Sequence, residues 1–165
     1  MKVIEVARLA FGAALLVLCG TAGAETQYIE IIDQTAPGSS SFVVDLEVVY
    51  APSDNGLASG IGFRVHFDSS QLNIADITMA LTASHIGTQV QLDVADYDND
   101  PSTDMVINAG WADINAAWPS GEMFPVTLYR VSFGKAEGFY GTSINISRSS
   151  TDTRYDFSGR GLSLD

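Results

Sequence analysis

Four aspartates lie within one short stretch, VADYDNDPSTD, that contains no Lys or Arg: Asp96, Asp98, Asp100 and Asp104. In an extended chain the first three point to the same side, each about 7 Å from the next. Ca²⁺ prefers about six to eight oxygen ligands, and such a run supplies carboxylates and carbonyls at close spacing. The pattern therefore predicts a calcium site, and we expect two flanking carboxylates to complete it, Asp93 and Asp113.

This stretch departs from the EF-hand template at two positions. When Asp96 is taken as position one, position six is Pro101 rather than Gly and position twelve is Ile107 rather than a bidentate Glu, although Asp104 fits position nine. Runs of like charge are often simply solvated, and they can also dock a cationic partner. The sequence leaves three interpretations open: a calcium site, a solvated acidic loop and a docking patch.

Aromatic residues near the predicted loops are candidates for ligand binding. An exposed ring can cover the apolar face of a sugar, as in many sugar-binding modules. Trp111 continues an apolar face that begins at Met105, which favours the core, whereas Trp118 is followed by Pro119 in a turn and is the better candidate for exposure. Together with Tyr97, these tryptophans form the predicted ligand-binding set. Packing in the core is the alternative, because large aromatic side chains are mostly buried.

The sequence contains no arrangement typical of an enzyme. Of its two histidines, His66 is expected on the outer face of a strand and His85 in a loop, and neither lies in a G-x-S-x-G or H-E-x-x-H motif. Pairs of carboxylates that resemble a glycosidase dyad are expected by chance in so acidic a chain. We therefore predict a non-catalytic protein.

The first 24 residues have the layout of a signal peptide. A weakly basic start is followed by an apolar run from Leu9 to Leu18 and by Ala22-Gly23-Ala24, which predicts cleavage after Ala24. The run is shorter than the roughly 20 apolar residues of a transmembrane helix, so no membrane insertion is expected after cleavage. The one cysteine, Cys19, lies in this segment, which leaves an exported domain, residues 25–165, without disulfides.

The net charge of the chain limits the kinds of partner that it can bind. The chain has 8 Lys and Arg and 20 Asp and Glu, a net charge of −12. Loss of Lys2, Arg8 and Glu5 with the signal peptide changes this to −13. Such a surface repels nucleic acid and anionic membranes, and it suits divalent cations, basic protein patches or uncharged glycans.

Alternation with a period of two residues dominates residues 25–165 and predicts an all-β domain. In SFVVDLEVVY the side chains of Phe42, Val44 and Tyr50 fall on one face, and GIGFRVHFD repeats the pattern. Turn residues separate about nine such segments, which indicates an antiparallel two-sheet sandwich or nine-stranded jelly roll, with one helical turn near 80–84. The segments are 28–33, 42–50, 60–68, 72–78, 88–95, 104–111, 128–135, 142–148 and 160–165.

Two of these segments carry a family resemblance. SGIGFRVHFDSSQLNIADI resembles the part of cohesin-type domains in which F-x-hydrophobic-x-[YF]-D is followed by L-x-hydrophobic, and LYRVSFGKAEGFYGTSINIS is similar to the later L-x-x-I-x-F passage. The residues that match are Phe63, Val65, Phe67, Asp68, Ser69, Ser70, Leu72 and Ile74, then Leu128, Val131, Phe133, Lys135, Gly141 and Ile144. The resemblance implies a nine-stranded jelly roll related to carbohydrate-binding modules of cellulases.

The resemblance also implies non-catalytic binding outside the cytoplasm. The acidic insert and GWADINAAWPSG set the chain apart from dockerin-binding cohesins and make it more similar to the cohesin-like domains of bacterial exported and surface proteins. The leading hypothesis is therefore a periplasmic, extracellular or cell-surface module that recognises a protein partner, with calcium as a potential stabiliser. A carbohydrate-binding module for an extracellular polysaccharide is the alternative, and a matrix or adhesion component is a third. The sequence does not indicate an oligomeric state.

Overall fold

The computed structural model describes residues 24–36 and 42–165. The predicted signal peptide, apart from Ala24, and Cys19 lie outside the described residues. Ten strands follow one another in these residues. Their bounds are β1 Glu25–Asp33, β2 Val43–Pro52, β3 Gly60–Phe67, β4 Leu72–Met79, β5 His85–Leu92, β6 Met105–Ala112, β7 Val126–Lys135, β8 Thr142–Thr151, β9 Tyr155–Arg160 and β10 Leu162–Leu164.

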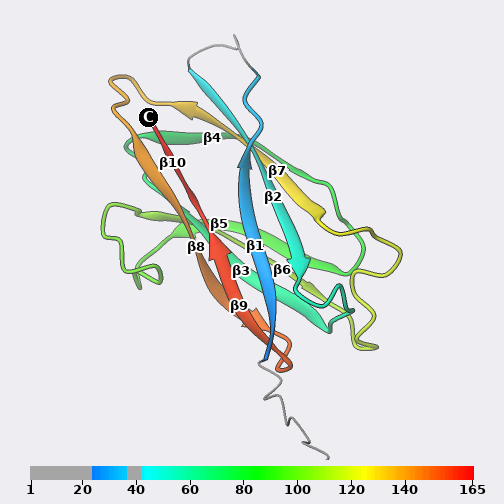
Figure 1. The fold of residues 1–165 in the computed structure, drawn as a ribbon. Helices are drawn as coiled ribbons and strands as arrows, with labels where there is room; N and C mark the ends of the chain where they lie inside the picture. The colour runs from blue at the N-terminus through cyan, green and yellow to red at the C-terminus, as the bar shows by residue number, and fades with distance from the viewer. Residues whose placement is uncertain (1–23, 37–41) are drawn as a thin grey trace, which may run out of the picture.

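The strands form two five-stranded sheets that pack face to face (Figure 1). One sheet has the order β4-β7-β2-β1-β9 and the other the order β10-β8-β3-β6-β5. All pairings between named strands are antiparallel except that of β1 with β9, which is parallel. The predicted all-β, two-sheet sandwich is confirmed. The described residues form no helix, and so none that could cross a membrane.

The core lies between the sheets and follows the predicted alternation. Phe63, Val65 and Phe67 of β3 face inward and are buried, as are Val44 and other alternate residues of β2. The rings of Phe67 and Phe133 meet across the two sheets with centroids 5.1 Å apart. Each sheet therefore buries one face of its strands, and the opposite faces are free to carry the polar side chains.

Four local expectations were wrong. His85, expected in a loop, is the first residue of β5 and pairs with Trp111 of β6. Phe42 precedes β2 and is exposed rather than inward-facing. Residues 80–84 form a bend and a turn, not a helical turn. The predicted last strand begins five residues earlier and is two strands, β9 and β10, which Gly161 separates. The sequence of β9, YDFSGR, does not alternate regularly between apolar and polar residues, since only Tyr155 is buried in this strand.

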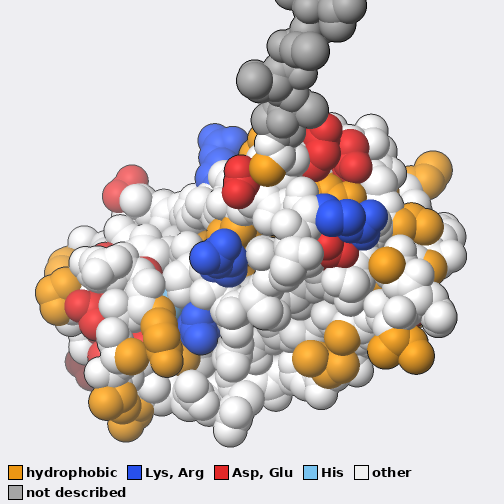
Figure 2. Space-filling view, turned by 90° about the horizontal axis from the view of Figure 1, so that it is seen from below, with side chains coloured by type: hydrophobic (Ala, Val, Ile, Leu, Met, Phe, Trp, Pro, Cys, Tyr) orange, Lys and Arg blue, Asp and Glu red, His pale blue; other side chains and the backbone are white. Residues whose placement is uncertain are grey.

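Basic side chains are scattered over the surface. On the face shown in Figure 2, Lys and Arg side chains form separate small patches, several of them next to acidic ones. Arg130 binds Glu47, Arg154 binds Asp152 and Arg160 binds Glu30, with N···O distances of 2.7, 2.8 and 3.0 Å. These arginines are thus partly neutralised by their neighbours.

Candidate functional site

The acidic loop, residues 93–104, connects β5 to β6 and folds back over the outer face of β3 and β8. Its backbone is a series of turns, in which the N–H groups of Asp96 and Asn99 donate to carbonyls three residues earlier, at 3.3 and 3.1 Å. Both residues have positive φ angles, 49° and 58°, which Asp and Asn tolerate better than most residues. The loop is therefore not extended, and the expectation that alternate aspartates point to one side was wrong.

His66 of β3 joins the loop to two strands. Its Nδ1 lies 2.8 Å from Oδ2 of Asp93 and 3.6 Å from Oδ1 of Asp98, and its Nε2 lies 2.7 Å from Oγ of Ser147 on β8. The ring points to the outer face of the sheet, as predicted, but the loop covers it completely. The side chains of Asp93 and Asp98 are almost wholly buried as well. This histidine is therefore the anchor on which the loop packs.

Neutral donors hold the other loop carboxylates in place. The side-chain amide of Asn145 donates to Asp98 and to Asp100, at 2.9 and 3.0 Å, and Thr103 Oγ1 donates to Asp98 at 2.8 Å. The hydroxyl and N–H of Ser102 donate to Asp100 and lower the pKa of its carboxyl below the ordinary value. Hydrogen bonds from the protein thus offset much of the repulsion within the loop.

Asp104 and Asp113, two further aspartates of the predicted site, lie apart from each other. Desolvation opposes ionisation of Asp104, but two hydrogen bonds from Ser69, both 2.7 Å, hold the pKa of its carboxyl below the usual range. Asp113 follows the opposite end of β6 and accepts the N–H of Asn115 at 2.8 Å. The whole length of β6 separates it from Asp104, so Asp113 does not join the acidic loop.

The structure does not gather the predicted calcium ligands into one shell. Among the described residues, the group of three His, Asp or Glu side chains whose ligand atoms all lie within 4.8 Å of one another is His66, Asp93 and Asp98. The carboxylate of Asp96 is exposed and makes no hydrogen bond or ion pair with the described part of the chain. Calcium binding by the loop stays a prediction. The sequence analysis missed His66 as a member of this cluster, although its outward position on β3 was a usable signal.

Ser147, His66 and Asp93 are connected in the order of a serine hydrolase relay. A general base must reach the proton that it takes from the nucleophile in the presence of substrate. The ring of His66 has no exposed surface, and Asp98 lies against its Nδ1 side. In this arrangement the relay fastens the loop to β3 and β8, which is a structural role.

The tryptophans are not a surface platform. Trp118 is only 1% exposed, and its ring packs on Tyr50 with centroids 4.7 Å apart. Backbone hydrogen bonds with Ala58 fix it there. Trp111 is also buried and donates its indole N–H to the carbonyl of Leu81 at 2.9 Å. The predicted exposure of Trp118 was wrong, because the segment after β6 folds back under the 52–60 loop and fills the end of the core; neither ring lies at the surface.

Tyr97 remains at the surface. Its ring is 49% exposed at the tip of the acidic loop, and the guanidinium of Arg64 lies 3.8 Å from the ring centroid. This distance is typical of a cation–π contact, which also ties the loop to β3. Tyr97 and Arg64 therefore form a raised border on the outer face of the sheet.

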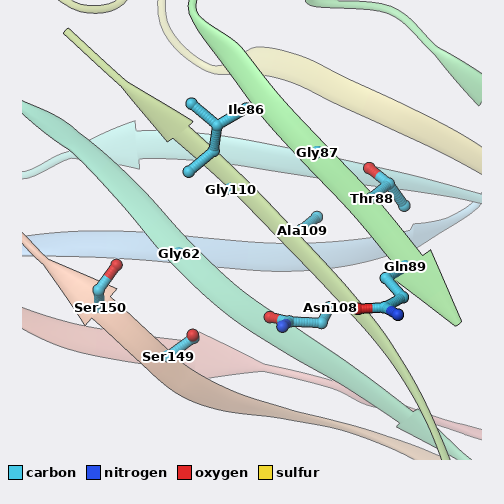
Figure 3. A pocket seen from close by; sticks show the side chains of 10 residues that line it. All are labelled: Gly62, Ile86, Gly87, Thr88, Gln89, Asn108, Ala109, Gly110, Ser149 and Ser150. Atoms are coloured by element: carbon cyan, nitrogen blue, oxygen red, sulfur yellow. The ribbon is translucent and has the colours of Figure 1, made fainter. Parts of the chain in front are cut away.

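A shallow groove of about 280 Å³ crosses this face next to that border. Gly87, Gly110 and Gly62 are paired in register across β5, β6 and β3, and Ser150 of β8 continues the row (Figure 3). Because the glycines have no side chains, the floor of the groove is backbone. The side chain of Ile86 lies over Gly110, where a Cβ atom would come within 3.2 Å of it.

Polar side chains without formal charge line the rest of the groove. Asn108, Gln89 and Ser149 offer amide and hydroxyl groups, and Ile86, which is 72% exposed, offers an apolar surface at one end. A flat sheet face with one exposed apolar anchor and several neutral hydrogen-bonding groups has the character of a protein-binding surface. The sequence did not point to this groove, since the glycines that form it come from three separate segments.

Comparisons with known proteins identify the fold. No model of a known protein family matches the chain, and no curated protein matches it. Among solved structures, the cohesin CaCohA2 of Clostridium acetobutylicum, solved in complex with CaDoc0917, is similar with a TM-score of 0.53 at 12% identity, over 84% of this chain and 97% of that one.

Two further similar structures are also cohesins, both from Acetivibrio cellulolyticus. The third cohesin of ScaC, in complex with the ScaB dockerin, has a TM-score of 0.52 at 12% identity, over 84% of this chain and 96% of that one. The sixth cohesin of scaffoldin B, in complex with a Cel5 dockerin, has a TM-score of 0.50 at 13% identity, over 81% and 96%. The chain therefore has the jelly-roll fold of cohesin domains.

Proposed function

We propose that this chain is a non-catalytic protein-binding module, and that the outer face of the sheet β10-β8-β3-β6-β5 is its binding surface. The cohesins named above were solved in complex with dockerins or, for CaCohA2, with CaDoc0917. Protein recognition is thus the use that those relatives in fold make of this sandwich. We also propose that the module is exported, because residues 1–24 have the layout of a signal peptide.

The observation that supports this face is the groove floored by Gly87, Gly110 and Gly62. A partner can approach the backbone closely at Gly87, where no atom lies within 4 Å of the Cβ position, while Ile86 lies over Gly110 and the Ser150 hydroxyl over Gly62. Ile86 can supply an apolar contact at one end of the groove, while Asn108 and Gln89 supply hydrogen bonds beside it. The bordering loop is rigidly attached to the sheet through His66, so the surface is largely preformed.

Polysaccharide binding is the weaker alternative. A sugar-stacking platform needs Trp118 and at least one other ring to lie coplanar on the surface, but Trp118 is buried. Of the three rings predicted to bind a ligand, Tyr97 is the one that is half exposed, and Arg64 covers one side of its ring. The proposal of a protein partner does not depend on such a platform.

The test is capture of partners from the producing organism, identified by mass spectrometry and then purified. Ser150→Arg places a long charged side chain in the groove, and Asn73→Arg, on the outer face of β4 in the other sheet, is the matched control. We expect Ser150→Arg to weaken binding of the purified partner at least about tenfold, a loss of about 1.4 kcal/mol, and Asn73→Arg to leave it unchanged. Equal binding by both variants, or retention on insoluble polysaccharides in place of any protein, would contradict the proposal.

A further inference from the structure

β5 differs from the other edge strands of the sandwich in having no protection against pairing. Within the described residues the edges are β4, β5, β9 and β10. β10 has three residues, β9 carries Asp156 and Arg160, and β4 carries Asp76 beside a break in its register. Short length, charges and bulges are the usual means by which edge strands avoid pairing with other chains.

The sequence of β5, HIGTQVQL, has no acidic, Lys, Arg or Pro residue. Its one register break lies at its beginning, between His85 and Gly87. From Gly87 to Leu92 the strand pairs regularly with β6 on one side, and no described strand pairs with its other side. An uncharged, regular edge of this kind can accept an additional strand.

Exposed apolar side chains lie along the unpaired edge of β5. Val90 and Leu92 are 40% and 63% exposed although their backbone positions face the inside of the sandwich, because they lie at its open margin. Val94 follows them and is almost fully exposed. An added strand would bury these side chains, which favours pairing beyond its backbone hydrogen bonds.

A cavity of about 280 Å³ lies where β5 ends. Leu92, Val94 and Pro101 form its apolar wall, and Asp96 and Asp104 stand at its rim. The carboxylate of Asp96 has no hydrogen-bond or ion-pair partner among the described residues. A Lys or Arg side chain fits this chemistry, because its methylene stem covers apolar surface while its charge stays near the carboxylates.

No Lys or Arg is among the residues that line this cavity. Between Arg64 and Arg130 the sequence contains no Lys or Arg, and all its charged residues other than histidine are acidic. Arg64 is already placed over the ring of Tyr97. A second copy paired through β5 would bring an equally uncharged strand and another acidic loop, so charge complementarity favours a different chain.

We propose that β5 accepts an extended segment of a partner protein as an added strand, with a Lys or Arg of that segment in the cavity formed by Leu92, Val94 and Pro101. This site shares Gly87, Thr88 and Gln89 of β5 with the glycine-floored groove, but Leu92 and the cavity beyond it lie outside the groove. Effects at Val90 to Leu92 therefore distinguish an added strand from a partner bound in the groove.

The experiment uses short capped peptides of alternating Val and Thr that end in Lys, Ser or Glu, titrated to millimolar concentration into the ¹⁵N-labelled domain. We expect shifts and slower hydrogen exchange at the amides of Gly87 to Leu92. The Lys-ended peptide should bind about fivefold tighter than the Ser-ended one, and the Glu-ended one should bind more weakly than both. Asp96→Asn should remove the advantage of Lys, since Asn keeps the positive φ at this position but not the charge.

Two matched variants control the result. Val90→Lys places a charge on the β5 edge and should abolish binding, whereas Thr78→Lys on the β4 edge should not. Asp156→Asn on β9 is the control for Asp96→Asn. The proposal is overturned if no peptide shifts the amides of Val90 to Leu92, if Lys- and Glu-ended peptides bind equally, or if the shifts are confined to the groove residues Gly62, Asn108, Gly110 and Ser150. Concentration-dependent dimers that Val90→Lys disrupts would assign the edge to a second copy and would overturn it as well.

Discussion

His66 and Asp93 form a fully buried pair, with 2.8 Å between Nδ1 and Oδ2 and no exposed surface on either side chain. The pair joins the third strand of the sandwich to the start of a loop that is rich in aspartate. A second carboxylate, that of Asp98, lies 3.6 Å from the same nitrogen. The acidic loop thus rests on the sheet through a histidine, and its shape follows from that contact.

His66→Ala should therefore destabilise the protein by about 3 kcal/mol, because it removes the side-chain partner of the buried Asp93 carboxylate and the ring on which the loop packs. Urea denaturation measures the loss, and hydrogen exchange in residues 93–104 should become faster. His85→Ala is the control, since His85 is half-buried and its one side-chain hydrogen bond is to Thr88, at 2.9 Å. We expect it to cost about 1 kcal/mol or less. Equal losses for the two variants would show that His66 does not hold the loop.

Asp152 predicts how stability depends on pH. The guanidinium of Arg154, together with the N–H groups of Arg154 and Ser59, holds the pKa of the Asp152 carboxyl well below its usual range despite desolvation. The unfolded chain therefore takes up the proton first as the pH falls below about 4, so the stabilisation is present above that pH and is lost below it. Asp100 and Asp104 act in the same direction.

Asp152→Asn should lower the free energy of unfolding at pH 7 by about 1–3 kcal/mol and should flatten its decline between about pH 4 and 2. Chemical denaturation at a series of pH values measures both effects. Asp156→Asn, an exposed position on β9, should leave the stability at pH 7 unchanged. A steeper decline in the Asp152 variant would contradict the assignment.

Much of the fold was predictable because the alternation of side chains is a local property. The inward faces of β2 and β3, including Phe63 and Val65, follow directly from the sequence. The site was less predictable, since it depends on contacts between distant segments. Asn145 stands between Asp98 and Asp100 because β8 lies beside β3, and the glycine row requires the registers of β5, β6 and β3. The turn before Pro119 suggested that Trp118 is exposed, but backbone hydrogen bonds to Ala58 bury it.

Trp118 should contribute to stability rather than to ligand binding. Trp118→Ala removes a ring that packs on Tyr50 and Trp111, and should cost about 3–5 kcal/mol. Trp118→Phe should cost clearly less, because the indole N–H of Trp118 is buried without a hydrogen-bond partner among the described residues. Thermal unfolding followed by calorimetry distinguishes the two. A Trp118→Ala protein that keeps its stability but loses affinity for a polysaccharide would contradict this role.

Calcium binding by the acidic loop can be tested directly. The carboxylates of Asp98 and Asp100 converge on one amide group, so they are near enough for a cation to join them if Asn145 turns its oxygen inward. On this basis we expect millimolar Ca²⁺ to raise the melting temperature by a few degrees relative to chelator, and Asp100→Asn to remove the rise. Asp113→Asn is the control, because Asp113 lies at the other end of β6. Identical melting with calcium and with chelator would leave the loop as a hydrogen-bonded, metal-free structure.

Substitutions at two glycines should distinguish an effect on partner binding from an effect on stability. A Cβ atom at Gly110 would meet the end of the flexible Ile86 side chain at 3.2 Å, so Gly110→Val should fill the groove with a loss of stability of about 1 kcal/mol. A Cβ atom at Gly60 would lie 2.1 Å from the carbonyl oxygen of Trp111, at a φ angle of 130°, so Gly60→Ala should cost several times more. The first variant should stay folded and lose its protein partner, whereas the second should unfold at lower denaturant concentration. Circular dichroism and binding of the purified partner, measured on the same preparations, check both outcomes. If Gly110→Val binds as the original chain does, the partner does not use the groove.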